Sequence, residues 1–480
     1  MTLRHYALLS AVLAACAPGA EASPVRGERA APPSVPADTA ISREELGRLV
    51  DSVFAAGMPA EKIPGGVFIM VQRGRVVLAK GYGVANVATR QRVSPDSTLW
   101  RIGSISKVMT AVGVVQLADR GRIRLSADVN QYLHRLRVPA TYGEPVTPWH
   151  LLTHTAGLDE LPGRSAPSRE AVLPLHVFLR ERLVRVRKPG RVIAYSSFGP
   201  ALSGALIEDV SGLAYETYLE RNVWRPLGMH RTNVTPGDDM PRGYDVRGDS
   251  VVQAAWEWSH TGPAGMVNST AADMGRFMNM MLGRHPDGPR VLRDSARTSM
   301  LTRQITTHPR VPGMGLGFQE DRINGRTIFE HGGDIHGYAS LMVLLPGEET
   351  GFFIATHREG AQLRYTLKQH LLDRFFPNRP SAGAAAAQPA IAIDLSPFAG
   401  EYRWNIFCRT CENPWLPGAI RVTANEDATL GFLDQKWVPV EPLLFQSADG
   451  RSLLGFAADS TGAVTQLTIG GTRVLERISR

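Results

Sequence analysis

The stretch Ser104-Ile105-Ser106-Lys107 is followed by apolar residues at Val108, Ala111, Val112, Val114, Val115 and Leu117. Residues three apart in a helix share one face, roughly 5–6 Å apart at Cβ, so the amine of Lys107 can reach the hydroxyl of Ser104. A serine hydroxyl is a weak nucleophile until a neighbouring base takes its proton. Burial disfavours an ammonium ion, so a buried Lys107 is suited to be that base. The stretch therefore predicts a nucleophile and its base on a buried helix that ends near Gly121.

The same spacing also starts ordinary helices, so other segments have to decide between the two interpretations. Of the six lysines in the chain, only Lys107 has a serine three residues before it. Two further motifs follow it. Tyr195-Ser196-Ser197 comes after Pro189-Gly190, and His331-Gly332-Gly333-Asp334 comes after Glu330. Taken alone, Tyr195 reads as a buried aromatic residue and His331 as a turn histidine.

The order Ser-x-x-Lys, Tyr-x-Ser, His-x-Gly resembles the serine β-lactamase and penicillin-recognising hydrolase superfamily. The resemblance is to the branch that holds class C β-lactamases, DD-peptidases, D-aminopeptidases and related esterases, and it covers roughly residues 41–375. Segments 151–158, 226–229 and 262–266 are similar to further markers of that family. It implies an α/β fold of the β-lactamase/DD-peptidase type, an antiparallel sheet flanked by helices with a helical subdomain.

The resemblance also implies a role for each motif. Ser104 would attack an acyl carbonyl, Lys107 would assist its deprotonation, and Tyr195 would carry the proton to the leaving group and then activate water. Tyrosine has an unperturbed pKa near ~10, and a protonated Lys107 would lower it. The backbone N–H groups of Ser104 and Asp334 would form the oxyanion hole.

The remaining motif residues would contact the substrate. Ser197 is one of them. We expect His331, Gly332 and Gly333 on an edge strand, where missing side chains let a substrate backbone approach.

Two residues depart from the pattern of many β-lactamases of this branch. Lysine often stands at the position of His331, and asparagine at that of Ser197. Lysine is a permanent cation for a β-lactam carboxylate, whereas histidine is only partly charged near neutrality. Both departures disfavour antibiotic hydrolysis as the main activity and are compatible with a peptidase or an esterase.

We therefore expect a serine hydrolase that forms an acyl-enzyme on Ser104 and acts on small esters, amides or D-amino-acid peptides. One alternative is a β-lactamase or DD-carboxypeptidase acting on cell-wall peptides. Another is a non-catalytic penicillin-recognising binding protein, since a fold alone does not guarantee chemistry. No cofactor and no metal are expected. His150 and His154 have a helical ligand spacing, but the Glu of a zinc-protease motif is absent.

The first 22 residues indicate export. Arg4 precedes an apolar stretch from Ala7, and Leu13-Ala14-Ala15-Cys16 resembles a lipoprotein processing site. Lipidation of Cys16 would anchor the protein to a membrane, in the periplasm or cell envelope. Cleavage after Ala22 would instead release it. Residues 23–40 are rich in Ala and Pro and read as a flexible tether.

Three further segments follow the tether. Residues 41–377 are expected to form the catalytic domain, which begins with a capping box at Ser42 and a hairpin around Arg73-Gly74-Arg75 that ends at Gly81-Tyr82-Gly83. Residues 378–393 read as a Pro/Ala-rich linker. Residues 394–480 read as a small β-barrel-like domain with strands at 419–423, 437–440, 452–456 and 464–469, and segment 395–402 resembles lipocalin-like modules.

The charge distribution and the cysteines indicate which macromolecules the protein binds and whether it holds a disulfide. The net charge of +8 comes from 53 Lys and Arg against 45 Asp and Glu, spread along the chain without a basic block that holds aromatics, so no nucleic acid is expected. Cys408 and Cys411 are compatible with a redox motif or half a zinc site. In an oxidising compartment we expect a local disulfide between them. The sequence leaves the oligomeric state open.

Overall fold

The computed structural model describes residues 40–235, 242–284, 290–378, 390–412, 416–448, 450 and 452–479. The predicted export segment 1–22 with Cys16, and the tether up to residue 39, lie outside these ranges. Within the described ranges, no helix has both the length and the apolar character needed to cross a bilayer.

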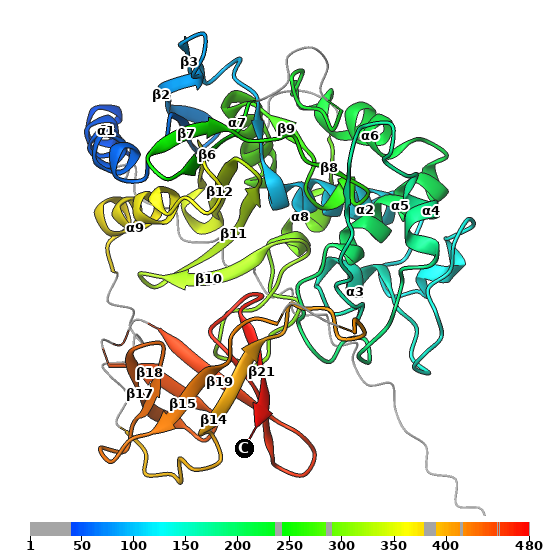
Figure 1. The fold of residues 1–480 in the computed structure, drawn as a ribbon, viewed down its shortest axis with the longest axis vertical. Helices are drawn as coiled ribbons and strands as arrows, with labels where there is room; N and C mark the ends of the chain where they lie inside the picture. Colours follow the sequence, from blue (N-terminus) through cyan, green and yellow to red (C-terminus); the bar gives the residue numbers. More distant parts are fainter. Residues whose placement is uncertain are drawn as a thin grey trace, which may run out of the picture. The chain divides into compact units, whose positions relative to one another are not determined.

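A seven-stranded antiparallel sheet organises the larger part of the chain, in the order β10-β11-β12-β13-β1-β2-β3 (Figure 1). Its strands are β1 (Gly65–Gln72), β2 (Arg75–Asn86), β3 (Gln91–Arg92), β10 (Gln319–Ile323), β11 (Arg326–Ile335), β12 (Tyr338–Leu345) and β13 (Thr350–His357). β1 pairs with β13, with Ile69 opposite Phe353. Every residue of β1, β12 and β13 is buried, as expected for strands covered on both faces. The predicted antiparallel sheet is confirmed.

The hairpin around Arg73-Gly74-Arg75 is present, but its predicted end is wrong. β2 continues past Gly81-Tyr82-Gly83 to Asn86, and Gly83 lies opposite Gly65 of β1. A Cβ at Gly81 would lie 2.3 Å from the carbonyl oxygen of Val93. These glycines allow neighbouring backbone to approach the strand closely and do not end it.

Helices cover both faces of the sheet. α1 (Arg43–Ala60) and α9 (Leu363–Phe375) lie side by side on one face (Figure 1). Ser42 caps α1, because its side chain accepts a hydrogen bond from the backbone N–H of Glu45, which is one half of the predicted capping box. The Glu45 carboxylate pairs with Arg374. Phe68 of β1 joins the core on this face, and its neighbour Ile69 joins the larger core on the other face.

The helical subdomain lies between β3 and β10 in the chain. α2 (Ser106–Asp119) is buried from Ser106 to Leu117 and packs against α5 (Phe198–Ser211). The other helices and turns are η2 (Gly103–Ile105), η3 (Val129–Gln131), α3 (Pro148–Leu152), α4 (Leu175–Arg180), α6 (Tyr215–Leu219), η4 (Glu220–Trp224), η5 (Gly262–Ala264), α7 (Ala271–Met281) and α8 (Asp294–Met300), with η6 (Pro346–Glu348) joining β12 to β13.

Short strand pairs tie this subdomain together. They are β4 (Trp100–Arg101) with β9 (Asn268–Ser269), β5 (Ser165–Ala166) with β8 (Trp258–Ser259), and β6 (Tyr244–Arg247) with β7 (Ser250–Gln253).

The C-terminal residues form a closed barrel of eight strands. The strands are β14 (Gly400–Trp404), β15 (Ile420–Ala424), β16 (Leu430–Phe432), β17 (Gln435–Glu441), β18 (Leu444–Ser447), β19 (Leu453–Ala458), β20 (Val464–Thr468) and β21 (Val474–Ser479). Aromatic side chains fill it, with Phe398 against Phe445 and Phe456. The predicted β-domain is thus a closed barrel without free sheet edges.

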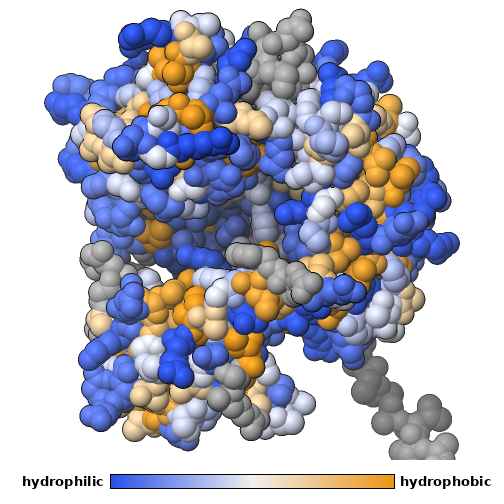
Figure 2. Space-filling model, in the orientation of Figure 1, coloured by the Kyte–Doolittle hydropathy of each residue, from blue (hydrophilic) through white to orange (hydrophobic). Residues whose placement is uncertain are grey.

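The barrel packs against the larger part through apolar and charged contacts. Val474 of β21 is buried against Ile193 and Met314, and Val440 and Leu444 pack on Val311. Elsewhere, on the face drawn in Figure 2, hydrophilic residues dominate and apolar ones form scattered groups, as is common on protein surfaces.

Candidate active site

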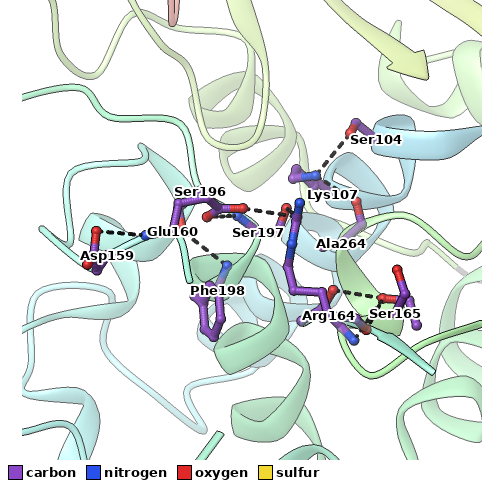
Figure 3. A network of polar contacts seen from close by, with 12 residues as sticks. Ser104, Lys107, Asp159, Glu160, Arg164, Ser165, Ser196, Ser197, Phe198 and Ala264 are labelled. Carbon is purple, nitrogen blue, oxygen red and sulfur yellow. Dashed lines mark hydrogen bonds and ion pairs between the residues drawn. The ribbon is translucent and has the colours of Figure 1, made fainter. Parts of the chain in front are cut away.

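Ser104 and Lys107 meet at the start of the central helix. Ser104 lies in the 3₁₀ turn η2, one turn before α2, and the Nζ of Lys107 lies 3.0 Å from its Oγ (Figure 3). Lys107 lies in the first turn of α2, and residues three apart in a helical turn share one face, which brings the two side chains together. The second partner of Lys107 Nζ is the carbonyl oxygen of Ala264, at 2.7 Å. Segment 262–266, a predicted family marker, thus supplies part of the lysine's environment.

The environment of Lys107 makes its ammonium group lose its proton more easily than that of a free lysine. Its side chain is buried, and burial lowers the pKa of its amine to about 7. Glu160 raises this pKa and Arg164 lowers it, both by smaller amounts. Near neutrality a large share of the molecules therefore carry a neutral amine beside Ser104 Oγ, which is the state that can accept a proton.

Tyr195 lies on the loop before α5, with its ring 4.8 Å from the Nζ of Lys107. Its ring also packs against His154, at 4.5 Å between centroids, and faces His331 at 6.1 Å. Burial raises the pKa of Tyr195, although its hydrogen bond with Ser104 lowers it. This differs from the sequence-based expectation that Lys107 would lower the pKa of Tyr195. Because burial raises the pKa of Tyr195, its hydroxyl is protonated near neutrality and can donate a proton.

His154 and His150 have separate structural contacts. The Nδ1 of His154 accepts a hydrogen bond from Ser196 N at 3.2 Å, and burial lowers the pKa of His154 well below its ordinary value. His150 completes the capping box of α3 with Thr147. In the described parts of the chain, no group of three or more His, Cys, Asp or Glu is arranged to hold a metal ion.

Two charged residues that the sequence analysis did not assign lie beside Ser197. Glu160 accepts a hydrogen bond from the backbone N–H of Ser197 at 2.9 Å, and Arg164 Nη1 donates to Ser197 Oγ at 2.5 Å (Figure 3). Arg164 and Glu160 form an ion pair at 2.9 Å. Their spacing of four residues was visible in the sequence, but no pattern indicated that their loop would contact a motif 33 residues later.

The strand that carries His331 is not the edge strand we expected. β10 pairs with the first half of β11, from Arg326 to Glu330, and residues 331–335 extend beyond this pairing. His331 is buried, and burial lowers its pKa to about 4, so it is uncharged near neutrality. Its Nδ1 contacts the carbonyl oxygen of Gly332 at 2.6 Å.

Gly333 has a packing role in addition to any contact with substrate. A Cβ there would lie 2.0 Å from the carbonyl oxygen of Ile102 and 2.5 Å from Ser340 Oγ. Glycine therefore lets the segment that carries Ser104 lie against β11. Gly103, at a φ of 53°, makes the same contact from the other side, because a Cβ on it would lie 2.9 Å from the backbone N of Asp334.

The side chain of Asp334 forms an ion pair with a neighbouring helix. Arg364 of α9 pairs with its carboxylate at 2.7 Å and also donates to the carbonyl oxygen of Gly333 at 2.8 Å. The backbone N–H groups of Ser104 and Asp334 belong to the two segments that Gly103 and Gly333 allow to meet. Away from the site, Cys408 and Cys411 form a disulfide in the loop after β14.

This fold, with a serine and a buried lysine three residues apart on its central helix, defines the class of β-lactamase and penicillin-binding-protein-like hydrolases. The family model described as Beta-lactamase matches residues 50–373, so the chain belongs to this family. It is 30% identical to penicillin-binding protein 4 of Amycolatopsis lactamdurans, over 68% of this chain and 88% of the relative. It is 28% identical to the D-alanyl-D-alanine-carboxypeptidase/endopeptidase AmpH of Escherichia coli strain K12, over 61% and 79% of the two chains.

Solved structures share the fold. The octameric penicillin-binding protein homologue of Pyrococcus abyssi aligns with a TM-score of 0.60 at 22% identity, covering 90% of this chain and 99% of its own. That coverage is large enough to include barrel residues. A class C β-lactamase of Rhodobacter sphaeroides aligns with a TM-score of 0.56 at 23% identity, covering 68% of this chain and 99% of its own.

Proposed function

We propose that the protein is an exported serine hydrolase that forms an acyl-enzyme on Ser104, with small esters, amides or D-amino-acid peptides as substrates. The observation that carries this proposal is the 3.0 Å contact between Ser104 Oγ and the buried Nζ of Lys107. Membership of a hydrolase family supports the class of reaction.

In the proposed acylation, Ser104 Oγ attacks the substrate carbonyl carbon while its proton passes to the neutral amine of Lys107. The N–H groups of Ser104 and Asp334 stabilise the oxyanion. The leaving group departs with the proton of the Tyr195 hydroxyl, and the Lys107 ammonium returns a proton to Tyr195. In deacylation, water attacks the carbonyl carbon of the acyl-enzyme while the neutral amine of Lys107 takes a proton from it. The bond between Ser104 Oγ and the acyl carbon breaks, Ser104 Oγ takes the proton of the Tyr195 hydroxyl, and the Lys107 ammonium returns a proton to Tyr195 as the acid leaves. No step uses a metal or an organic cofactor.

The test is hydrolysis of p-nitrophenyl butyrate by the purified full-length protein, beside Ser104→Ala. Turnover by the wild type that Ser104→Ala lowers by at least about 10³-fold supports the proposal. A fluorophosphonate probe should label the wild type on Ser104 and leave the variant unlabelled. Equal rates in both proteins would contradict Ser104 as the nucleophile. Ligand binding without turnover on esters or peptides would favour the non-catalytic binding protein.

A DD-carboxypeptidase is the second candidate, and Arg164 favours it. Only Nη1 of this guanidinium contacts Glu160 and Ser197; within the described ranges, its Nε and Nη2 have no acceptor, and the side chain is 41% exposed. A guanidinium with free donors suits the terminal carboxylate of a peptide. Arg164 carries the positive charge that the uncharged His331 lacks. We therefore propose that the carboxylate of the substrate binds to Arg164.

Peptides ending in D-Ala-D-Ala, with a free carboxylate or a C-terminal amide, test this assignment. A hydrogen bond to a charged group contributes about 1.5–3 kcal/mol, so Arg164→Gln should raise KM for the free acid roughly 10–150-fold. The amide should be affected far less. An equal change for both peptides would contradict carboxylate binding by Arg164. A cephalosporin assayed alongside measures the β-lactamase alternative, which the neutral His331 disfavours.

The N-terminal predictions also stay proposals. We propose that the predicted export segment 1–22 is cleaved before Cys16 and that Cys16 is lipidated, so that residues 23–40 belong to the tether to the envelope, and that 378–393 link the catalytic domain to the barrel. Mass spectrometry of the mature protein and of Cys16→Ala distinguishes lipidation from cleavage after Ala22.

A further inference from the structure

A buried carboxylate joins the barrel to the larger part of the chain. Asp159 is 1% exposed, and its carboxylate accepts hydrogen bonds from the backbone N–H of Arg409 at 2.9 Å and of Thr410 at 3.0 Å. The Thr410 hydroxyl donates a third bond at 2.8 Å. The Sγ of Cys408, which carries no proton in its disulfide, lies 3.6 Å away. These donors belong to the turn that the Cys408–Cys411 disulfide closes, which we call the clamp turn (residues 408–411).

Asp159 is the direct neighbour of a site residue. The backbone N–H of Glu160 donates to the Asp159 carboxylate at 3.1 Å, and the Glu160 carboxylate in turn holds Ser197 and Arg164 (Figure 3). A chain of hydrogen bonds therefore runs from the clamp turn through Asp159 and Glu160 to Ser197.

The barrel also holds the segment that carries Tyr195. Asn405 Nδ2 donates to the carbonyl oxygen of Ile193 at 2.9 Å, two residues before Tyr195, and Asn405 is itself 2% exposed. Val474 packs on the same Ile193. The next residue, Ala194, donates its backbone N–H to the carbonyl oxygen of His154 at 2.8 Å. The ring of His154 in turn packs against the ring of Tyr195.

A charged network surrounds these contacts. Arg187 of the larger part pairs with Glu476 of β21 at 3.0 Å, and Arg409 of the clamp turn pairs with the same glutamate. Both Arg187 and Glu476 are mostly buried. A buried carboxylate such as Asp159 is strongly unfavourable without donors, so the clamp turn and the loop 159–164 hold each other in one arrangement.

We infer that Asp159 is a positioning residue of the hydrolytic site, and that the barrel, through the clamp turn and Asn405, fixes the Glu160–Ser197 and Tyr195 segments against Ser104 and Lys107. This inference rests on the proposed function. It gives the barrel a positioning role, although none of the described barrel residues belongs to the proposed hydrolytic site.

The test compares Asp159→Ala and Asp159→Asn with the wild type, all as full-length protein. A displacement of about 1 Å in positioned groups can cost 10²-fold in rate, so Asp159→Ala should lower kcat for p-nitrophenyl butyrate by up to about 100-fold. Asp159→Asn keeps one acceptor oxygen and should lose less. The fluorophosphonate probe should still label Ser104 fully in both variants, because Ser104 and Lys107 do not contact the clamp turn.

Asp209→Asn is the matched control. The Asp209 carboxylate is also buried and accepts a backbone N–H, from His134 at 2.8 Å, beside an arginine, Arg135. It should keep the wild-type kcat. The inference is overturned if Asp159→Ala folds and keeps its kcat, or if Asp209→Asn loses as much. If Asp159→Ala does not fold, the kcat of Asp159→Asn decides in the same way. Failure of the proposed function is distinguishable, since the wild type would then show neither turnover nor labelling.

Discussion

In the proposed mechanism, the amine of Lys107 determines how the hydrolytic activity responds to pH. Because burial lowers the pKa of Lys107 to about 7, the lysine is an ammonium ion below this pH and cannot accept the proton of Ser104. We expect kcat/KM for p-nitrophenyl butyrate to rise with pH, with its midpoint near pH 7, and to level off above it. A profile that is flat from pH 5 to 9 would argue against Lys107 as the base. Lys107→Arg, which stays charged, should lose about 10²–10⁴-fold.

Tyr195 should matter most where the leaving group needs a proton. Burial raises the pKa of Tyr195, so it acts as a proton donor, and an amide nitrogen requires that donation whereas p-nitrophenolate does not. Tyr195→Phe should therefore slow acylation by a peptide about 10²–10⁴-fold. The burst phase with p-nitrophenyl butyrate should slow much less. Equal losses on both substrates would indicate that Tyr195 serves another step.

Single-residue features were predictable where they depend on local spacing. Ser104 and Lys107 are three residues apart, and any helical turn brings them together. The ion pair of Glu160 and Arg164 was not predictable, since its role depends on a loop folding onto Ser197 from elsewhere in the chain. The predicted lowering of the Tyr195 pKa was wrong because Tyr195 is buried by residues that include His154 and His331, which come from distant segments of the chain.

At the level of elements, β11 packs closely against Ile102, the residue that leads into the turn η2. Gly333→Ala would place a Cβ 2.0 Å from the backbone oxygen of Ile102, which cannot move without displacing Ser104. We expect destabilisation of about 1–3 kcal/mol and loss of most activity. Thermal denaturation and the ester assay measure both.

Gly332→Ala, one residue earlier on the same strand, is the control. The nearest atom to its Cβ would be the hydroxyl of Tyr365, at 3.2 Å, at the end of a partly exposed side chain that can shift. Its stability should stay within about 0.5 kcal/mol of the wild type. If both substitutions have the same effect, the contact with Ile102 does not explain the glycine at 333.

The strands illustrate how far sequence patterns reach. The hairpin of β1 and β2 was predicted from a local turn, and β15, β17, β19 and β20 from short apolar runs. β11 is not an edge strand because β10 pairs with it. The residue pattern of one strand does not predict which strands pair with it, so this position was not predictable. The glycines at 81 and 83 were predicted to end β2, whereas Gly81 accommodates backbone from another segment. Gly333 also accommodates such backbone, a role that the sequence did not indicate, and its predicted contact with substrate stays a prediction.

At the level of the whole molecule, buried histidines make stability depend on pH. His357 lies against Trp100, Tyr244 and Tyr338, and burial lowers its pKa to about 3. In the unfolded chain the pKa of His357 is near ~6.5, so as pH falls the unfolded chain binds this proton before the folded protein does. The contribution of neutral His357 to the free energy of unfolding is therefore fully present above that pH and is lost as pH falls below it. The slope is about 1.4 kcal/mol per pH unit for one group.

Denaturant unfolding at pH 6.5, 5.5 and 4.5 checks this contribution. His357→Phe keeps an aromatic ring in the cluster and removes the titrating group. Its free energy of unfolding should fall with decreasing pH less steeply than that of the wild type, by about 1.4 kcal/mol per unit. Carboxylates titrate alike in both proteins and cancel in the comparison. Parallel slopes would show that His357 does not supply the dependence.

The pairing of β1 with β13 and the bonds between Asp159 and Thr410 also set an order of assembly during biosynthesis. The ribosome releases β1 long before its neighbour β13, and the partner of Asp159 follows it by 251 residues. A nascent chain therefore carries Ser104 and Lys107 early. It can complete the sheet only once β13 is made, and the surroundings of Asp159 only once the clamp turn is made, when most strands of the barrel are still to follow. The proposed hydrolysis therefore needs more of the chain than Ser104 and Lys107, and a chain that ends before the clamp turn keeps Ser104 without the contacts that position its surroundings.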